Sequence, residues 1–74
     1  MILSSVRLNE PANPYKFIDE SSINEWLLAN VGPHAPTMDT VSEERPWRVE
    51  HHFRYIVYHF ARESDAMMFS LRWQ

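Results

Sequence analysis

The last 28 residues of the chain, 47–74, constrain the fold more than any other stretch. They hold seven of the ten aromatic residues and three of the four histidines, and they contain neither glycine nor proline. Aromatic and β-branched residues dominate positions 53–60, which favours a strand there. Ser64 and Asp65 can begin a short helix, because a serine caps a helix start and an acidic residue suits its first turn. The segment therefore predicts a strand that leads into a helix, with residues 71–73 forming either the last helical turn or a closing strand.

Residues 47–60 fit two patterns. As a strand, their odd-numbered positions form a mostly apolar face, whereas the even-numbered face begins polar and ends apolar. As a helix, five apolar side chains fall on one side: Val49, Phe53, Ile56, Val57 and Phe60. The composition favours the strand. A single strand over this range is unusually long, which predicts a bend or bulge near His51 and His52.

The clearest local signal is a helix at residues 22–30. Ser22 and Glu25 fit a capping box, in which each side chain satisfies a free amide at the helix start. Apolar residues follow at helical spacing: Ile23, Trp26, Leu27 and Val31. Gly32 suits the left-handed position after a helix end, and Pro33 stops any continuation. We expect Trp26 to be buried, because it lies on the apolar face.

The remaining segments predict a short strand and two loops. Residues 2–8 alternate weakly between apolar and polar side chains, which fits an edge strand. Residues 9–14 contain two prolines and indicate a turn, after which residues 15–18 can be extended. Residues 32–46 form a proline-rich loop of a length that is usually either functional or disordered. The expected fold is α+β, a small antiparallel sheet with one or two short helices packed on one face.

Length and composition exclude several classes of protein. Seventy-four residues make one domain, residues 1–74, with a thin core. The absence of cysteine excludes disulfides and thiolate metal sites, and it agrees with a cytoplasmic location. No apolar run approaches the length of a membrane span, and the first residues lack the pattern of a signal peptide. We therefore expect no membrane partner.

The histidines and serines do not predict a catalytic or metal site. On one continuous strand, His51 and His59 share a face but lie about 26 Å apart, and His51 and His52 point to opposite faces. The serines lie in no nucleophile-elbow context, and one glycine cannot build a phosphate-binding loop. We expect a chain that is not an enzyme and that uses no metal, cofactor or small-molecule ligand.

The charge is divided unevenly along the chain. Residues 1–44 carry two basic and seven acidic side chains, whereas residues 45–74 carry five arginines and three acidic side chains. Arginines interleaved with aromatic residues in the C-terminal part suit nucleic-acid binding, because aromatic rings stack bases and arginines hold phosphates. Cross-strand aromatic packing explains the same residues without a ligand. Nucleic acid is therefore a possible but not a favoured partner.

Protein binding is the class that the sequence favours. A protein partner or self-association suits a small chain with surplus aromatic residues, since tryptophan, tyrosine and arginine anchor many interfaces. A structural subunit of a virion or an oligomer is an alternative. The candidate surface comprises Arg48, His52, Arg54, Tyr58, Arg72 and Trp73, with the loop at residues 32–46 as a second place of interest.

The C-terminal end of the chain also resembles a known group of proteins. Residues 60–73 read F-A-R-E-S-D-A-M-M-F-S-L-R-W. This run is similar to the endings of small uncharacterised proteins of tailed bacteriophages, which follow the pattern Phe-x-x-Glu-x-Asp-Ala-x-x-Phe-x-Leu-Arg-Trp. The resemblance covers about a fifth of the chain. It implies a phage origin and no known activity, and it leads to the expectation of a modulator or inhibitor of a host protein in the host cytoplasm.

Overall fold

The computed structural model describes residues 3–9 and 18–74. Three strands, two α-helices and one short 3₁₀ helix follow each other along this part of the chain. In chain order they are β1 (Ser4–Asn9), α1 (Glu20–Asn30), η1 (Met38–Thr40), β2 (Trp47–His52), β3 (Tyr55–Phe60) and α2 (Glu63–Trp73). The expected α+β fold, an antiparallel sheet with helices packed on one face, is confirmed.

The three strands form an antiparallel sheet in the order β1-β3-β2. β3 is the central strand, and it carries most of the aromatic and β-branched run of the sequence. It pairs with β1 from Ser4 opposite Phe60, and with β2 from Trp47 opposite Phe60. Both edges of the sheet therefore belong to short strands, as the weak alternation at residues 2–8 predicts for β1.

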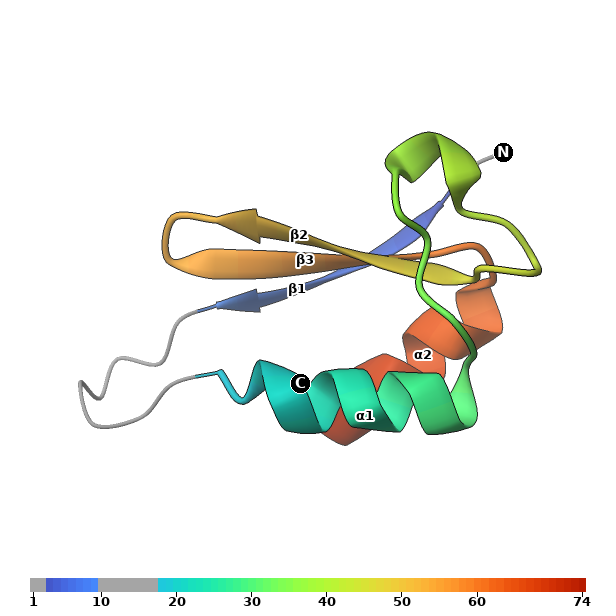
Figure 1. Ribbon diagram of the computed structural model, residues 1–74. Helices are drawn as coiled ribbons and strands as arrows, with labels where there is room; N and C mark the ends of the chain where they lie inside the picture. The colour runs from blue at the N-terminus through green and yellow to red at the C-terminus, as the bar shows by residue number, and fades with distance from the viewer. Residues whose placement is uncertain (1–2, 10–17) are drawn as a thin grey trace.

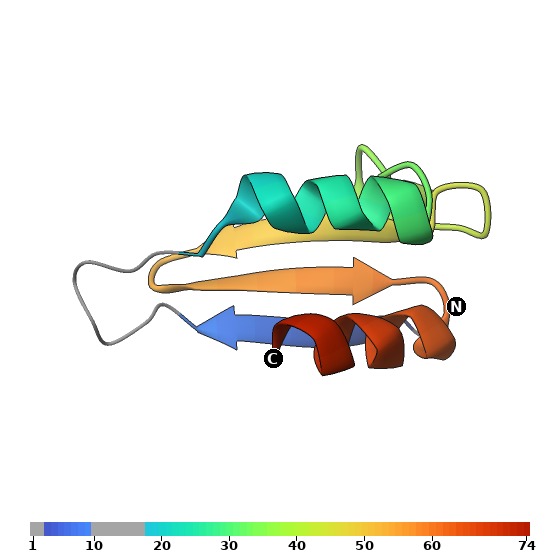
Figure 2. The same ribbon diagram turned by 90° about the horizontal axis from the view of Figure 1, so that it is seen from below.

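Both α-helices lie on the same side of the sheet (Figure 1). Seen from that side, α1 lies in front of β2 and α2 lies in front of β1 (Figure 2). The opposite side carries only the segment around η1, which rises over the end of the sheet where β2 begins (Figure 1). The rest of that side is uncovered by any helix or strand of the described chain.

The hydrophobic core lies between the helices and the sheet. Tyr58 and Phe60 of β3 are fully buried there, and their rings lie 4.8 and 5.2 Å from the ring of Phe69 on α2. The other buried members come from all the main elements: Val6, Leu8, Ile23, Leu27, Trp47, Ile56 and Ala66. Aromatic packing is therefore the main apolar contact in a domain that has no disulfide.

Trp26 bridges the two helices. It is partly buried, and its ring meets Phe69 and Trp73 edge-on at 6.3 and 6.4 Å. The expectation that Trp26 is buried is met only in part, because its side chain is half-buried at the margin of the core.

Helix α1 begins two residues before the predicted start. The prediction of a capping box at Ser22 and Glu25 is wrong, because Asp19 is the capping residue and accepts a hydrogen bond from the backbone N–H of Ser22 at 3.2 Å. Ser22 contributes through its hydroxyl, which donates to the same carboxylate at 2.7 Å. These two bonds lower the pKa of Asp19, the hydroxyl of Ser22 having the larger effect. At the other end, Gly32 has a φ of 140°, as its predicted role requires.

The loop at residues 32–46 makes three contacts with Trp47. Ala35 donates its backbone N–H to the carbonyl of Trp47 at 2.7 Å, and His34 forms an isolated parallel bridge with the same residue. The indole N–H of Trp47 donates to the carbonyl of Gly32 at 2.7 Å. Trp47 therefore ties both the start of the loop and the start of β2 to the core.

The single bent strand predicted for residues 47–60 is wrong, because these residues form a hairpin. β2 ends at His52 and β3 begins at Tyr55, with Phe53 and Arg54 between them. Arg54 adopts a φ of 68° in the left-handed region, where glycine and asparagine are far more common. The reversal also changes which positions face the core: odd-numbered residues in β2 but even-numbered residues in β3.

Helix α2 extends from Glu63 to Trp73, so residues 71–73 form its last turn and not a closing strand. The predicted cap at Ser64 is wrong, because Arg62 occupies the N-cap position and no side chain caps the helix there. Instead, Arg62 donates to Asp65 at 2.6 Å. Asp65 is thus a buried acidic residue with a cationic partner.

Two predictions lie almost entirely outside the described residues, namely the turn at residues 9–14 and the extended segment at residues 15–18. Only Asn9 and Ile18 of these two segments are described. Within residues 3–9 and 18–74, neither α-helix combines the length and the apolar composition that crossing a membrane requires.

Candidate functional site

The face of the sheet opposite the helices brings together nine side chains in three rows. The strand register places Ser5, His59 and Arg48 side by side, then Arg7, Val57 and Glu50, then Asn9, Tyr55 and His52. We call these nine residues the open face. Apart from Val57 and Tyr55, each side chain is polar or charged, which is the ordinary pattern of an antiparallel sheet with one solvated side.

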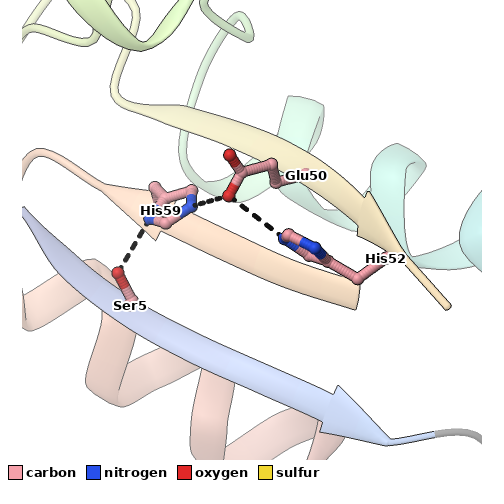
Figure 3. A network of polar contacts seen from close by, with 4 residues as sticks. All are labelled: Ser5, Glu50, His52 and His59. Carbon is pink, nitrogen blue, oxygen red and sulfur yellow. Dashed lines mark hydrogen bonds and ion pairs between the residues drawn. The ribbon is translucent and has the colours of Figure 1, made fainter. Parts of the chain in front are cut away.

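A continuous chain of polar contacts crosses the open face (Figure 3). The hydroxyl of Ser5 on β1 lies 2.8 Å from Nδ1 of His59 on β3. On its other side, Nε2 of His59 lies 3.0 Å from Oε2 of Glu50 on β2, and the same oxygen lies 3.4 Å from Nε2 of His52. All three strands are therefore linked through one imidazole and one carboxylate.

The hydrogen-bond directions in this chain follow from the tautomer of His59. When Nε2–H of a neutral His59 donates to Glu50, Nδ1 is free to accept the hydroxyl proton of Ser5. The hydrogen bonds from His59, and to a smaller degree from His52, lower the pKa of the Glu50 carboxyl. The side chain of His59 is only 13% exposed, whereas Glu50 is 42% exposed. The order hydroxyl, imidazole, carboxylate also occurs in activated serines.

A second arrangement on the open face is a stack of three side chains. The imidazole of His52 lies 4.6 Å from the ring of Tyr55, with an angle of 10° between the two planes. The guanidinium of Arg7 lies 3.9 Å from the centre of the same ring. The Nε–H of Arg7 donates to Asn9 at 2.9 Å, which fixes the orientation of the guanidinium plane. Tyr55 thus holds two cationic or protonatable groups at defined positions.

The turn between β2 and β3 extends this surface. We call Phe53 and Arg54 the hairpin tip. Phe53 is 84% exposed, and it is the only exposed aromatic side chain in the described part of the molecule. The guanidinium of Arg54 lies 5.2 Å from its ring. An exposed aromatic ring beside an arginine in a strained backbone combines residue types that are common at binding hot spots.

A shallow cavity of about 400 Å³ lies at the same end of the sheet. It extends from the hairpin tip to the start of α1, and its lining includes Ile18, Glu20, His51 and Ile56. His51 contacts the carboxylate of Glu20 there, so the tip is also tied to the helix layer. A second cavity, of about 500 Å³, lies between the ends of β1 and α2.

Three of the six residues predicted for an interaction surface lie on the open face or at the hairpin tip. His52 belongs to the stack, and Arg54 belongs to the tip. Arg48 lies on the open face, but its guanidinium donates to the carbonyls of Ala35 and Pro36 at 3.3 and 2.6 Å. The guanidinium of Arg48 therefore holds the loop at residues 32–46. It is less available to bind a partner than the guanidinium of Arg54 is.

The other three predicted residues lie elsewhere. The prediction for Tyr58 is wrong, because its side chain is fully buried and its hydroxyl donates to Asn24 at 3.3 Å. This burial, with a smaller effect from the charge of Glu20, raises the pKa of Tyr58. Arg72 and Trp73 lie at the end of α2, on the helix side of the sheet, where the guanidinium is 4.5 Å from the indole.

The sequence alone did not indicate the residues that organise the open face. Ser5, Glu50 and His59 come from three strands, and only the register of the hairpin brings them together. The alternation of Arg48, Glu50 and His52 on the polar side of one strand is the only signal that points to this face. Treating residues 47–60 as a hairpin instead of one strand would have placed His52 and His59 on the same side.

The histidines form no metal site in the described residues. No group of three or more histidine or acidic side chains there is arranged to hold an ion. His52 and His59 approach Glu50 from opposite sides, as Figure 3 shows.

Comparisons of the chain with protein-family models, with curated proteins and with solved structures returned no match.

Proposed function

We propose that this protein is a small non-enzymatic binding domain that recognises a partner protein through the hairpin tip and the adjoining open face. The exposure of Phe53 carries the proposal. Every other aromatic side chain of the described residues is buried or half-buried, whereas this ring projects from a two-residue turn. A large apolar ring left in water at the end of a hairpin is a plausible anchor for an interface.

The backbone of the tip supports the same proposal. Arg54 has a positive φ of 68°. This backbone conformation costs free energy for every residue except glycine, and the cost is smaller for asparagine than for other residues. Backbone preference therefore does not explain why an arginine occupies this position. Strain of this kind often accompanies binding or catalytic positions.

The position of Ser5 supports a binding role over a catalytic one. The hydroxyl of Ser5 lies on the open face and lines neither of the two cavities, whereas His52 at the other end of the polar chain lines the first. Catalysis by an activated serine needs a site that positions the substrate and stabilises the developing charge. We therefore propose that the chain from Ser5 to His52 orders the binding face and does not carry out a reaction.

The proposed partner is a protein of a bacterial host. This part of the proposal rests on the likeness of residues 60–73 to the endings of small tailed-phage proteins. In this proposal the protein acts in the host cytoplasm, where it modulates or inhibits a host protein. Most of residues 60–73 belong to helix α2, which packs against the core. The segment that resembles the phage proteins therefore stabilises the fold and does not form the proposed contact surface.

Affinity capture from bacterial lysates with three forms of the chain tests the proposal. Phe53→Ser removes the exposed ring, and Leu71→Ser is the matched control because Leu71 is 88% exposed on α2. Both substitutions leave the core intact, which circular dichroism can verify. We expect the wild type and the Leu71→Ser form to enrich the same protein and the Phe53→Ser form to lose it.

Equal enrichment by all three forms would contradict a role for the hairpin tip. Retention of single-stranded DNA or RNA by the wild type, with no protein enriched, would favour a nucleic-acid function instead. A concentration-dependent increase in molecular mass that Phe53→Ser abolishes would show that the tip mediates self-association.

A further inference from the structure

The charges of the described residues are separated between the open face and the rest of the molecule. The open face and the hairpin tip carry three arginines, Arg7, Arg48 and Arg54, and one acidic residue, Glu50. The other described residues carry three arginines and eight acidic residues, the latter being Asp19, Glu20, Glu25, Asp39, Glu43, Glu44, Glu63 and Asp65. The surface that carries Phe53 is thus locally cationic in a chain with a net charge of −3.

Two of the three arginines on this surface have no acidic partner among the described residues. Arg7 and Arg54 form no ion pair with any residue in the ranges 3–9 and 18–74. Their guanidinium groups lie against the rings of Tyr55 and Phe53. An arginine placed on an aromatic ring keeps its outer N–H groups directed to solvent, where they can bind a carboxylate in two-point geometry.

The single acidic residue of the open face is already engaged. Oε2 of Glu50 lies between the Nε2 atoms of His59 and His52, so these two imidazoles offset its charge when they are protonated. Ser5 on β1, Glu50 on β2 and Tyr55 on β3 are the groups that face the two histidines on the sheet. Protonation of His52 and His59 therefore increases the positive charge of the face by two.

We propose that the open face and the hairpin tip bind an acidic segment of the partner protein. This inference rests on the proposed protein-binding function and adds the chemistry of the partner. Carboxylates of the segment pair with Arg7 and Arg54, while Phe53 and the stack on Tyr55 supply apolar contact. Nucleic acid fits less well, because the middle row of the face contains the carboxylate of Glu50 and Arg48 is held by loop carbonyls.

Selection from a random-sequence 12-residue peptide library tests the proposal with the intact chain. We expect the recovered peptides to be enriched in aspartate and glutamate relative to the input. For one synthesised peptide, the double variant Arg7→Gln/Arg54→Gln should raise Kd roughly tenfold, as the loss of two weak ion pairs would do. Arg7→Lys/Arg54→Lys should recover part of the affinity, and Arg72→Gln on α2 should leave it unchanged.

Ionic strength gives an independent check on the same peptide. Affinity should fall as salt rises, because exposed charges are screened over about 8 Å at physiological ionic strength. Peptides without acidic enrichment, an unchanged Kd for the double glutamine variant, or tighter binding of a single-stranded oligonucleotide of equal charge would each overturn the proposal.

The outcomes separate this inference from the proposed function. Recovered peptides that lack acidic residues but lose affinity with Phe53→Ser would leave protein binding at the tip intact and refute only the acidic partner. Failure to recover any peptide, together with no protein captured from lysate, would refute both.

Discussion

Glu50 and His59 lie nine residues apart in the sequence but face each other across two neighbouring strands, with Oε2 and Nε2 separated by 3.0 Å. The contact exists because the chain reverses at Phe53 and Arg54. It connects the outer strand β2 to the centre of the sheet on the side that no helix covers (Figure 3). The open face is therefore a consequence of the hairpin, and so is the surface that we propose for binding.

The lowered pKa of Glu50 predicts a specific dependence of stability on pH. Its ordinary value is 4.5, and the hydrogen bonds from His59 and His52 lower it in the folded state. At pH values between the folded-state and the unfolded-state pKa of Glu50, this carboxyl is more protonated in the unfolded chain than in the folded one. The free energy of unfolding therefore falls as the pH falls through this range. Urea unfolding should show Glu50→Gln less stable than the wild type at pH 5, with the gap closing as the pH drops below the ordinary value.

His59→Asn provides the control for this prediction. The substitution removes the main donor to Glu50, so Glu50→Gln should have a smaller effect on stability in that background. A gap between wild type and Glu50→Gln that stays constant from pH 5 to pH 3 would show that the contact does not influence the ionisation of Glu50.

Replacing Arg54 with glycine should separate stability from binding. Glycine adopts the φ of 68° without strain, so we expect the free energy of unfolding to rise by about 1 kcal/mol. The same substitution removes a guanidinium from the hairpin tip and should weaken partner binding. Thermal unfolding and a binding titration on the same sample measure both effects.

Arg54→Lys is the matched variant, since it keeps the charge and the strain. It should leave the thermal midpoint close to that of the wild type. A lower midpoint for Arg54→Gly than for the wild type would mean that the arginine side chain stabilises the turn more than its backbone conformation destabilises it.

Gly32 should tolerate no side chain. Its φ of 140° lies outside the range that L-residues readily adopt, and an added Cβ would lie 3.3 Å from the Cγ of Pro46. We expect Gly32→Ala to lower the free energy of unfolding by about 1–3 kcal/mol. Ala29→Gly, on the exposed side of α1, provides a comparison in which only helix propensity changes. Equal stability of Gly32→Ala and wild type in urea would contradict the strain.

Phe69 is the residue on which the thin core depends most directly. Its ring is fully buried and contacts Trp26, Tyr58 and Phe60. Phe69→Ala should cost about 3–5 kcal/mol, which is comparable to the whole stability expected for a domain of this length. We therefore expect this variant to lack cooperative unfolding at 25 °C in circular dichroism. A cooperative transition close to that of the wild type would show that α2 is dispensable to the core.

The helices were predictable because their signals are local. The apolar spacing of Ile23 and Leu27 and the glycine that follows α1 mark that helix in the sequence, even though Asp19 and not Ser22 caps it. The start of α2 was predicted two residues too late, through a cap at Ser64 that the structure does not use. Errors at helix ends of one or two residues are expected where several capping residues are adjacent.

The hairpin was not predictable from the turn residues. Phe53 and Arg54 lack the glycine, asparagine or aspartate that normally mark a two-residue turn. Without that signal the run appeared to be one long strand with its odd-numbered positions toward the core, whereas the even-numbered positions face the core after the turn. Tyr58 was therefore assigned to the surface, whereas it lies in the core. His52 and Arg54 were assigned correctly to exposed positions, but their association with Arg7, Tyr55 and Phe53 depends on strand register.

Mapping the contact surface by NMR tests the central claim most directly. Captured partner, or a selected peptide, is added to the uniformly ¹⁵N-labelled chain, and changes in backbone amide signals are followed residue by residue. We predict that the perturbed amides lie at the hairpin tip and along the open face, with the strongest effects at Phe53, Arg54 and Tyr55. Perturbations that instead cluster on the exposed side of α2, at Met67 and Leu71, would contradict the assignment of the binding surface.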